Sequence, residues 1–379
     1  MNYIKKFFFQ FKVYVFITFY SLIISVILFE GYLHYKEYKS EKSKIELFNY
    51  DVRSKFQYYI DNKNLGFVPV MSNMELYEDN DEIFALSSFS KSKLVFCNES
   101  GVFSTYTSDR YGFNNNDDIY EKKIDNIFLG DSFAQGACVL RSENIISNYS
   151  KISKQQSLNL GYSWSGPLNS YARLKEYIVP GAKNIFLLYY EGNDMEDLNS
   201  ELYNNILLKY LKDDNFTQNL KNKQNTINDL QFRFLKKKEK EFKDIQKNKN
   251  LILDIFLLRK FREYYLVRKD KHERNKIYLD EFEIIINKIQ KLTRENKSNL
   301  YFVYLPEYHR FRPFYKKSNF YKILNVVNNL NIDFINIASI MEAEKDPLNF
   351  FHFREYSHYT AQGYNFVASK IFDYVENKQ

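Results

Sequence analysis

Short apolar runs recur along the chain from residue 123 onward and alternate with longer, more polar stretches. Five such runs stand at residues 123–130, 157–161, 183–192, 299–306 and 332–337. Continuous apolar runs of this length are typical of strands buried on both faces, and helical stretches between them indicate parallel crossovers. The pattern therefore predicts an α/β fold of three layers, with a parallel sheet between two layers of helices.

Two regions depart from this alternation. Residues 65–116 consist of short alternating stretches, which favour strands and turns packed beside the main domain. Residues 198–298 predict a long, mostly helical insertion, in which segment 231–250 carries eight Lys and Arg against three Asp and Glu. A solvated helix face explains this segment most simply, and contact with an anionic glycan or with lipid headgroups is the alternative.

A run of uncharged, mostly apolar residues lies near the N-terminus, from Val13 to Phe29. A membrane helix needs about 17–25 such residues. A cleavable signal has an apolar region of only ~7–15 residues and a small-residue cleavage site, which this sequence does not display. The run therefore predicts a transmembrane signal-anchor that stays on the protein.

The charges around this run predict its orientation. Lysines precede it at positions 5, 6 and 12, which favours a cytoplasmic N-terminus over residues 1–12. Beyond the anchor we expect a stalk over residues 30–60 and a domain over residues 61–379. The domain would then lie on the periplasmic or extracytoplasmic side of the cytoplasmic (inner) membrane.

Composition adds little to this picture. The chain has 379 residues, of which 45% are hydrophobic, enough for a packed core. The formal charge of +7 accompanies a general abundance of Lys and Asn. We therefore expect no nucleic-acid partner.

The two cysteines, Cys97 and Cys138, both follow the anchor. Because thiols oxidise outside the cytoplasm, a disulfide between them is expected. Two unpaired buried thiols are the alternative, because the sequence does not give their separation.

Polar loops follow three of the predicted strands and read GDSFAQG, NLGYSWSGP and YEGNDMEDL. Loops at the carboxyl ends of parallel strands share one edge of the sheet. Acyl transfer needs a nucleophilic hydroxyl and donors for the oxyanion that forms. Ser132 can supply the hydroxyl, while its own N–H, the Gly161 N–H and the Asn193 amide are the predicted oxyanion donors.

A serine nucleophile also needs a base. Among five histidines, His358 is the candidate, because it precedes a helix and has Glu355 three positions upstream to orient its ring. His352 is a rival base, and Asp346 is a second choice for the third member. The roles expected for Asp131 and Asp194 are structural support, since such carboxylates usually cap helices or turns.

Two aromatic residues in the second loop leave two interpretations open. Tyr162 and Trp164 can line an acyl or sugar pocket, or they can pack in the core.

The order of these motifs resembles the SGNH/GDSL hydrolase superfamily over about residues 97–372, with the insertion excluded. Ser132, Gly161, Asn193 and His358 fall on the four positions that name the superfamily. Two departures stand out. Glu355 occupies a place where Asp is usual, and Gly192 adjoins Asn193 directly, where one residue usually separates them.

Further stretches, SDRYGFNN at 108–115 among them, are similar to a membrane-anchored bacterial subgroup of that superfamily. The resemblance implies a flavodoxin-like sheet and no metal or organic cofactor. It also implies ester hydrolysis or acyl transfer on acyl esters, in the first place acetyl esters, of a cell-envelope glycan. The alternative is a catalytically inactive envelope protein of the same fold that binds a glycan or an assembly partner.

Overall fold

The computed structural model describes residues 2–78, 82–248, 250–263 and 277–378. It divides into two compact units. The first joins Met1–Val52 to Glu239–Asn275, and the second joins Arg53–Lys238 to Lys276–Gln379. The second unit contains both sheets and all the predicted site residues.

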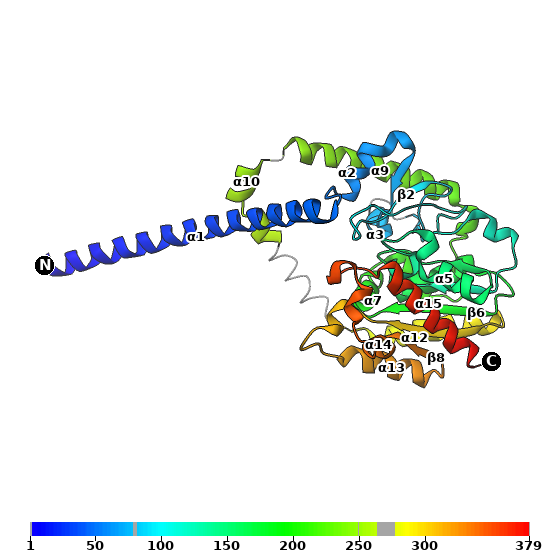
Figure 1. The fold of residues 1–379 in the computed structure, drawn as a ribbon. Coiled ribbons are helices and arrows are strands. Elements are labelled where there is room, and N and C mark those ends of the chain that lie inside the picture. The colour runs from blue at the N-terminus through cyan, green and yellow to red at the C-terminus, as the bar shows by residue number, and fades with distance from the viewer. Residues whose placement is uncertain (1, 79–81, 249, 264–276, 379) are drawn as a thin grey trace. The chain divides into compact units, whose positions relative to one another are not determined.

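The main sheet is five-stranded, and every neighbouring pair in it is parallel (Figure 1). Its strands in chain order are β4 (Asn126–Leu129), β5 (Ser157–Asn159), β6 (Asn184–Tyr190), β7 (Asn299–Leu305) and β8 (Asp333–Asn336). Their spatial order, β5-β4-β6-β7-β8, is the flavodoxin-like doubly wound order. The predicted α/β fold is confirmed.

Alternate residues of each strand point to opposite faces of the sheet, because the side-chain period of a strand is two. In β6, Ile185 and Leu187 belong to one hydrophobic cluster, while Phe186 and Leu188 belong to another. The first cluster includes buried residues of α6 (Pro167–Tyr177), α12 (Leu279–Glu295) and α13 (Ser318–Asn329). The second includes residues of α4 (Ser132–Gln135), α5 (Ile145–Ser153), α14 (Ile337–Glu342) and α15 (Ala361–Glu376). Helices therefore cover both faces, which is why the strands read as continuous apolar runs.

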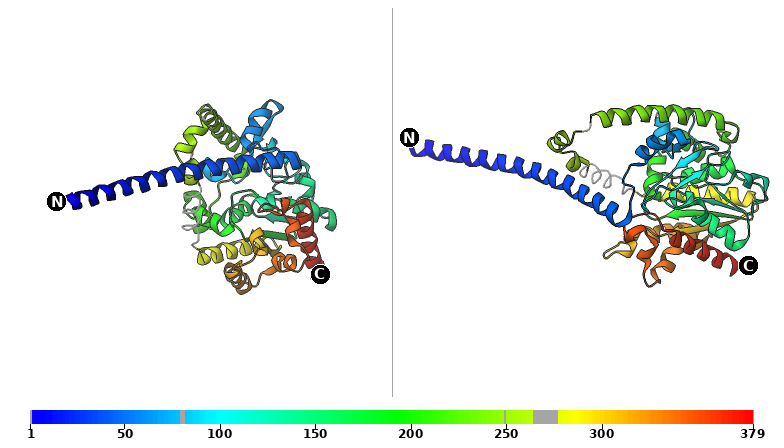
Figure 2. Two further views of the ribbon diagram at one scale, coloured as in Figure 1. Left: turned by 60° about the vertical axis from the view of Figure 1, so that its left-hand side comes forward. Right: turned by 45° about the horizontal axis from the view of Figure 1, so that its top comes forward.

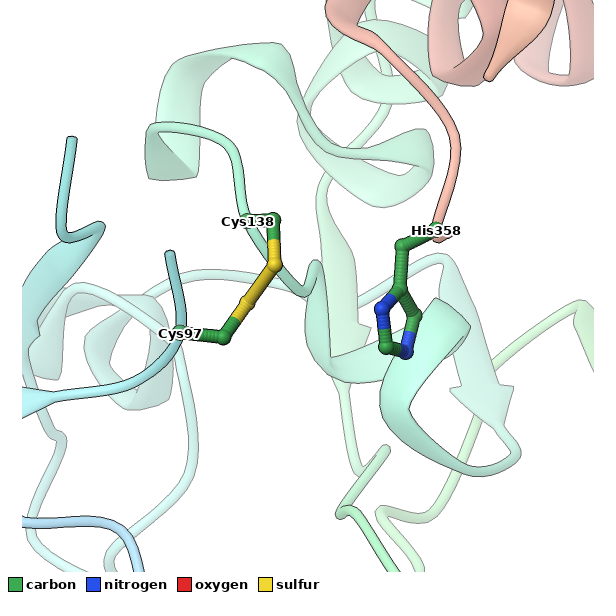
Figure 3. Close-up of side chains that lie close together, drawn as sticks. All are labelled: Cys97, Cys138 and His358. Atoms are coloured by element: carbon green, nitrogen blue, oxygen red, sulfur yellow. A yellow bond between two sulfur atoms is a disulfide. The ribbon is translucent and has the colours of Figure 1, made fainter. Parts of the chain in front are cut away.

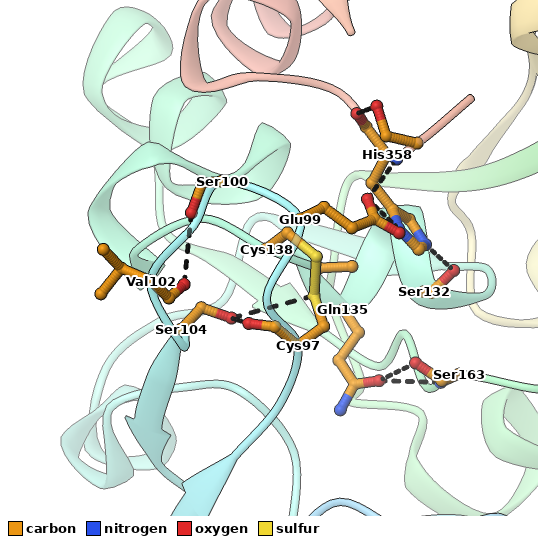
Figure 4. The surroundings of a disulfide bond; sticks show 12 residues. Cys97, Glu99, Ser100, Val102, Ser104, Ser132, Gln135, Cys138, Ser163 and His358 are labelled. Carbon is orange, nitrogen blue, oxygen red and sulfur yellow. Dashed lines mark hydrogen bonds and ion pairs between the residues drawn. A yellow bond between two sulfur atoms is a disulfide. The ribbon is translucent and has the colours of Figure 1, made fainter. Parts of the chain in front are cut away.

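Residues 53–121 add a small three-stranded sheet, as the alternating pattern predicted. Its strands β1 (Phe67–Pro69), β2 (Lys93–Val95) and β3 (Thr105–Thr107) follow the order β1-β2-β3. Helices α2 (Lys55–Asn62) and α3 (Asn73–Glu78) lie in the same region. The loop between β2 and β3 contains Cys97, whose sulfur is bonded to that of Cys138, just after α4 (Figure 4).

The predicted insertion is mostly helical where the structure describes it, and residues 249 and 264–276 lie outside the described part. Its helices besides α12 are α7 (Asp194–Glu201), α8 (Asn205–Lys212), α9 (Gln224–Lys247) and α10 (Leu251–Phe256). On α9, Ile227, Leu230 and Phe234 are buried, whereas Lys236 and Lys237 are exposed. The basic segment therefore forms the solvated face of an amphipathic helix.

Short 3-10 helices are also present in the described part of the chain. They span Lys63–Leu65, Asp117–Glu121, Arg141–Glu143, Leu220–Asn222, Tyr308–Phe311, Pro347–Phe350 and His352–Arg354.

One described helix, α1 (Asn2–Phe48), is long and apolar enough to cross a membrane. An eighteen-residue window of it has a mean hydropathy of 2.1, and 6% of that window is buried. The helix runs without interruption past residue 30, so the expected stalk begins as a continuation of the same helix.

The disulfide gives a prediction about stability. Cys97 and Cys138 are 41 positions apart, and closing such a loop stabilises the fold by about 4 kcal/mol in the chain-entropy model. A reducing agent should therefore lower the Tm of the protein. The Cys97→Ser/Cys138→Ser variant should start at the lower Tm and stay unchanged on reduction, and an equal response of both proteins would contradict the prediction.

Candidate active site

Ser132 is the first residue of α4, directly after β4 and a two-residue turn. Asp131 is the N-cap of this helix, and its Oδ1 accepts a hydrogen bond of 2.9 Å from the Phe133 N–H. Gly130 has a φ of +145°, and a Cβ there would meet the Leu188 carbonyl oxygen at 2.7 Å. The turn therefore needs glycine, and the Ser132 N–H lies in the first helical turn, where backbone N–H groups have no intrahelical acceptor.

His358 lies against Ser132, as predicted. Its Nε2 is 2.8 Å from Ser132 Oγ (Figure 4). The ring also contacts Phe133, with the two ring centroids 4.7 Å apart. The imidazole belongs to the loop before α15. Helix α15 lies on the same face of the sheet as α4.

The carboxylate that orients His358 is Glu99, from the loop between β2 and β3. Its two oxygens lie 3.0 and 2.9 Å from His358 Nδ1, and Oε2 also accepts a 2.6 Å hydrogen bond from the His358 backbone N–H. An Nδ1–H that donates to this carboxylate leaves the Nε2 lone pair facing the Ser132 hydroxyl. Glu99, His358 and Ser132 thus form one chain of hydrogen bonds.

Glu99 is held in its charged form. Burial favours the neutral acid, but the hydrogen bonds and charge of His358 outweigh it and lower the pKa of Glu99 below its usual value. A carboxyl group with a lowered pKa in the folded state stabilises the fold above its unfolded pKa. That contribution is lost as the pH falls through the folded pKa.

The prediction that Glu355 fills this position was wrong. Glu355 is exposed, and the two residues before it, Phe353 and Arg354, both have left-handed φ angles, of 53° and 57°. Because this stretch is not a regular turn, a spacing of three does not bring the carboxylate to the ring. Asp346, the second choice, instead accepts hydrogen bonds from the Arg354 guanidinium.

His352, the rival base, takes no part in the contact with Ser132. Its Nε2 is buried without a hydrogen-bond partner among the described residues. The pKa of His352 is lowered from its usual value, mainly because the side chain is buried.

Gly161 has a packing role that the sequence did not reveal. Its N–H, predicted to hold an oxyanion, instead donates to Asn159 Oδ1 at 2.8 Å. A Cβ at Gly161 would lie 2.4 Å from the Ala134 Cβ and 2.5 Å from the Gln135 nitrogen. This glycine therefore lets the second loop pack directly on the backbone of α4, and its predicted role as a donor is corrected.

Asn193 follows β6, the strand paired with β4, and is the N-cap of α7. Its Nδ2 donates to Asp197 Oδ2 at 2.7 Å. An amide nitrogen carries two hydrogens, so one remains for another acceptor.

Asp131 and Asp194 make contacts that fit structural roles. Asp194 Oδ2 accepts from the Tyr190 N–H at 2.9 Å, which ties α7 back to the end of β6. Burial raises the pKa of both carboxyl groups, that of Asp194 well above its usual value.

The two aromatic residues of the second loop differ in environment. Tyr162 is buried and donates from its hydroxyl to the Met71 carbonyl at 2.8 Å, so it belongs to the core. Trp164 is 44% exposed, and its ring lies 4.7 Å from Lys55 Nζ. Burial lowers the pKa of Lys55 to about 8.

Cys97, Cys138 and His358 place potential metal-ligand atoms within 4.8 Å of one another (Figure 3). Metal binding by cysteine requires a thiolate. Both sulfurs are engaged in the disulfide, so this cluster is not a metal centre while the bond is intact.

Several solved structures are similar to this chain, among them the following three. A lipolytic protein of the G-D-S-L family from Desulfitobacterium hafniense DCB-2 covers 65% of this chain and 96% of its own, at 10% identity and a TM-score of 0.37. The lipase/acylhydrolase from Enterococcus faecalis covers 68% and 97%, at 11% identity and a TM-score of 0.37. The acetyl xylan esterase AlAXEase covers 66% and 98%, at 13% identity and a TM-score of 0.34. No family profile and no curated protein sequence matches the chain.

The contact between Glu99 and His358 gives a prediction about activity. Glu99→Gln should lower kcat/KM for an ester by up to about 10⁴-fold, because a neutral amide neither fixes the histidine tautomer nor stabilises the imidazolium. The matched control is Glu355→Gln, which changes an exposed carboxylate and should keep nearly full activity. Initial rates with p-nitrophenyl acetate measure both variants, and a greater loss in Glu355→Gln would refute the arrangement.

The close packing of Gly161 gives a second prediction. Gly161→Ala should lower the free energy of unfolding by about 1–3 kcal/mol, the usual cost of overpacking, and should reduce turnover because α4 carries Ser132. Gly31→Ala serves as the control, since a Cβ there meets nothing within 4 Å. Denaturant unfolding and steady-state rates are the measurements, and similar behaviour of the two variants would argue against this role.

Proposed function

We propose that this chain is a serine esterase or O-acyltransferase acting on acyl esters. The observation that carries the proposal is the hydrogen-bond chain Glu99–His358–Ser132, with an Nε2 to Oγ distance of 2.8 Å. A hydroxyl, a base within reach of its proton and a carboxylate that orients the base are the groups that nucleophilic acyl transfer requires.

In the first half of the reaction, Ser132 Oγ attacks the ester carbonyl carbon while its proton passes to His358 Nε2. The tetrahedral oxyanion is held by the Ser132 N–H and by the Asn193 amide hydrogen that does not bind Asp197. Collapse of the intermediate breaks the bond to the alcohol, which leaves with the proton from His358. Glu99 stabilises the imidazolium throughout this exchange.

In the second half, His358 takes a proton from a second nucleophile, which attacks the acyl-serine. Water yields the free acid and restores Ser132. A sugar hydroxyl yields a new ester, and the enzyme is then a transferase. No step calls on a metal or an organic cofactor.

We further propose that the substrate is an acylated glycan at the extracytoplasmic face of the cytoplasmic membrane. The supports are the apolar helix α1, the lysines before it and the disulfide, which is typical of oxidising compartments. An acetyl group is the acyl group we expect first.

The competing proposal, a non-catalytic glycan-binding or assembly protein, rests on Glu in place of Asp before the histidine and on the long insertion. The first of these supports no longer applies, because the carboxylate at His358 is Glu99. The geometry therefore favours a working enzyme.

Covalent labelling tests the nucleophile directly. A fluorophosphonate probe should modify the wild-type protein at Ser132, and Ser132→Ala should remain unlabelled and lose p-nitrophenyl acetate hydrolysis. Mass analysis of the peptide identifies the site. Because Ser163→Ala removes a buried serine hydroxyl elsewhere, it should still label, and labelling of Ser132→Ala would overturn the proposal.

Acyl transfer and hydrolysis are then separated by adding an oligosaccharide acceptor to the same assay. An acceptor that gains the acyl group identifies a transferase. Release of acetate at a rate independent of the acceptor identifies a hydrolase.

A further inference from the structure

Helix α10 is unusual because it buries none of its side chains. Six apolar residues in it and just after it are exposed by 42–67%, namely Leu251, Ile252, Leu253, Phe256, Leu257 and Phe261, whereas Ile255 and Leu258 are half-buried. Contiguous apolar side chains on a surface mark a contact with a partner or a membrane. Leaving them in water forgoes the free energy gained by burying their exposed apolar area.

This segment is fixed to the transmembrane helix. Glu30 of α1 is fully buried, and its two carboxylate oxygens accept hydrogen bonds from the backbone N–H groups of Lys260 and Phe261, at 2.6 and 2.9 Å. Lys260 Nζ also binds Glu37 at 2.9 Å. Figures 1 and 2 show α10 beside α1.

The position of Glu30 sets the depth of the segment. Glu30 follows Phe29, the last residue of the predicted span, so Phe261 is held near the outer edge of the hydrocarbon. With a rise of about 1.5 Å per residue, Glu37 lies only about 12 Å beyond Phe29 along α1. The headgroup layer is about 5–8 Å thick on each side.

An apolar groove continues from α1 onto this segment. Phe29 and Leu33 of α1 line it together with Phe261. Lys36, Glu37, Ser40 and Lys260 also line the groove. The apolar surface of α1 therefore meets that of the segment at Phe261, beside polar groups.

Basic side chains flank the apolar residues. Lys243, Lys247 and Arg262 are exposed, on either side of α10 along the chain. An apolar set bordered by Lys and Arg is the arrangement of segments that lie in the membrane interface, where the basic groups meet anionic headgroups.

We propose that residues 251–261 form a second membrane contact, which lies in the outer interface of a bilayer containing anionic lipid beside α1. Leu253, Phe256 and Leu257 enter the boundary between headgroups and acyl chains. The buried Glu30 carboxylate fixes the segment at that depth by holding the Lys260 and Phe261 N–H groups. The proposal does not depend on the reaction at Ser132.

Site-directed spin labelling of the full-length protein tests this contact. Both native cysteines are in the disulfide, so a third cysteine takes the label specifically. The label at Phe256→Cys reports on the segment, and the label at Leu22→Cys reports on the membrane span. Phe314→Cys is the reference for a label in water, because Phe314 is 99% exposed. The proteins are reconstituted in vesicles of phosphatidylethanolamine and phosphatidylglycerol, and collision with oxygen and with a water-soluble nickel chelate is measured.

The collision frequency of a label at position 256 with oxygen should equal that of a label at position 22. Its collision frequency with the nickel chelate should be several-fold lower than that of a label at position 314. Leu257→Cys provides a second site with the same expectation, should the first variant fail to fold. Access to the chelate equal to that at position 314 would overturn the proposal. A label shielded from both reagents would also overturn it, because protein, such as a second copy of this chain, would then cover the segment.

Discussion

The site around Ser132 depends on how the loop between β2 and β3 is held. Cys97 is bonded to Cys138 at the end of the nucleophile's helix, and Ser104 donates from its N–H to the Cys97 carbonyl at 2.8 Å. Both constraints lie next to Glu99, which makes three contacts with His358. The disulfide therefore holds the loop that carries Glu99 close to the end of the nucleophile's helix, where Glu99 contacts His358.

A buried polar network supports the neighbouring loops. Arg173 is fully buried and donates to Ser165 Oγ at 2.8 Å, and burial lowers its pKa to about 10. Glu201 accepts hydrogen bonds from the Leu168 N–H and Asn169 Nδ2 at 2.9 and 2.6 Å. Because an unpaired buried polar group is costly, these contacts tie the first turn of α6 to α7. The buried Glu201 carboxylate thus supports the loops near the site, whereas Ser132 lies at the edge of the sheet.

The sequence predicted those features that follow from local pattern. The apolar runs indicated the strands, the polar loop after one of them indicated Ser132, and the place of His358 before a helix indicated the base. It failed at Glu355, because a spacing of three says nothing about the left-handed turn at Phe353 and Arg354. A signal for Glu99 was present: a bond between Cys97 and Cys138 would bring residue 99 to the nucleophile's helix.

What the sequence determined by itself was the alternation of strands and helices, the apolar N-terminal helix and the two residues that face each other at 2.8 Å. The elements depend on periodicity, the place of Ser132 on the rule that loops after parallel strands share an edge, and the choice of His358 on its place before the last helix. Only the tertiary structure decided which carboxylate meets His358 and where the Gly161 N–H points. The first depends on a contact between segments 259 residues apart, and no local pattern records such a distance. The second depends on the Asn159 side chain, which accepts from the Gly161 N–H and donates to the Ala134 carbonyl of α4.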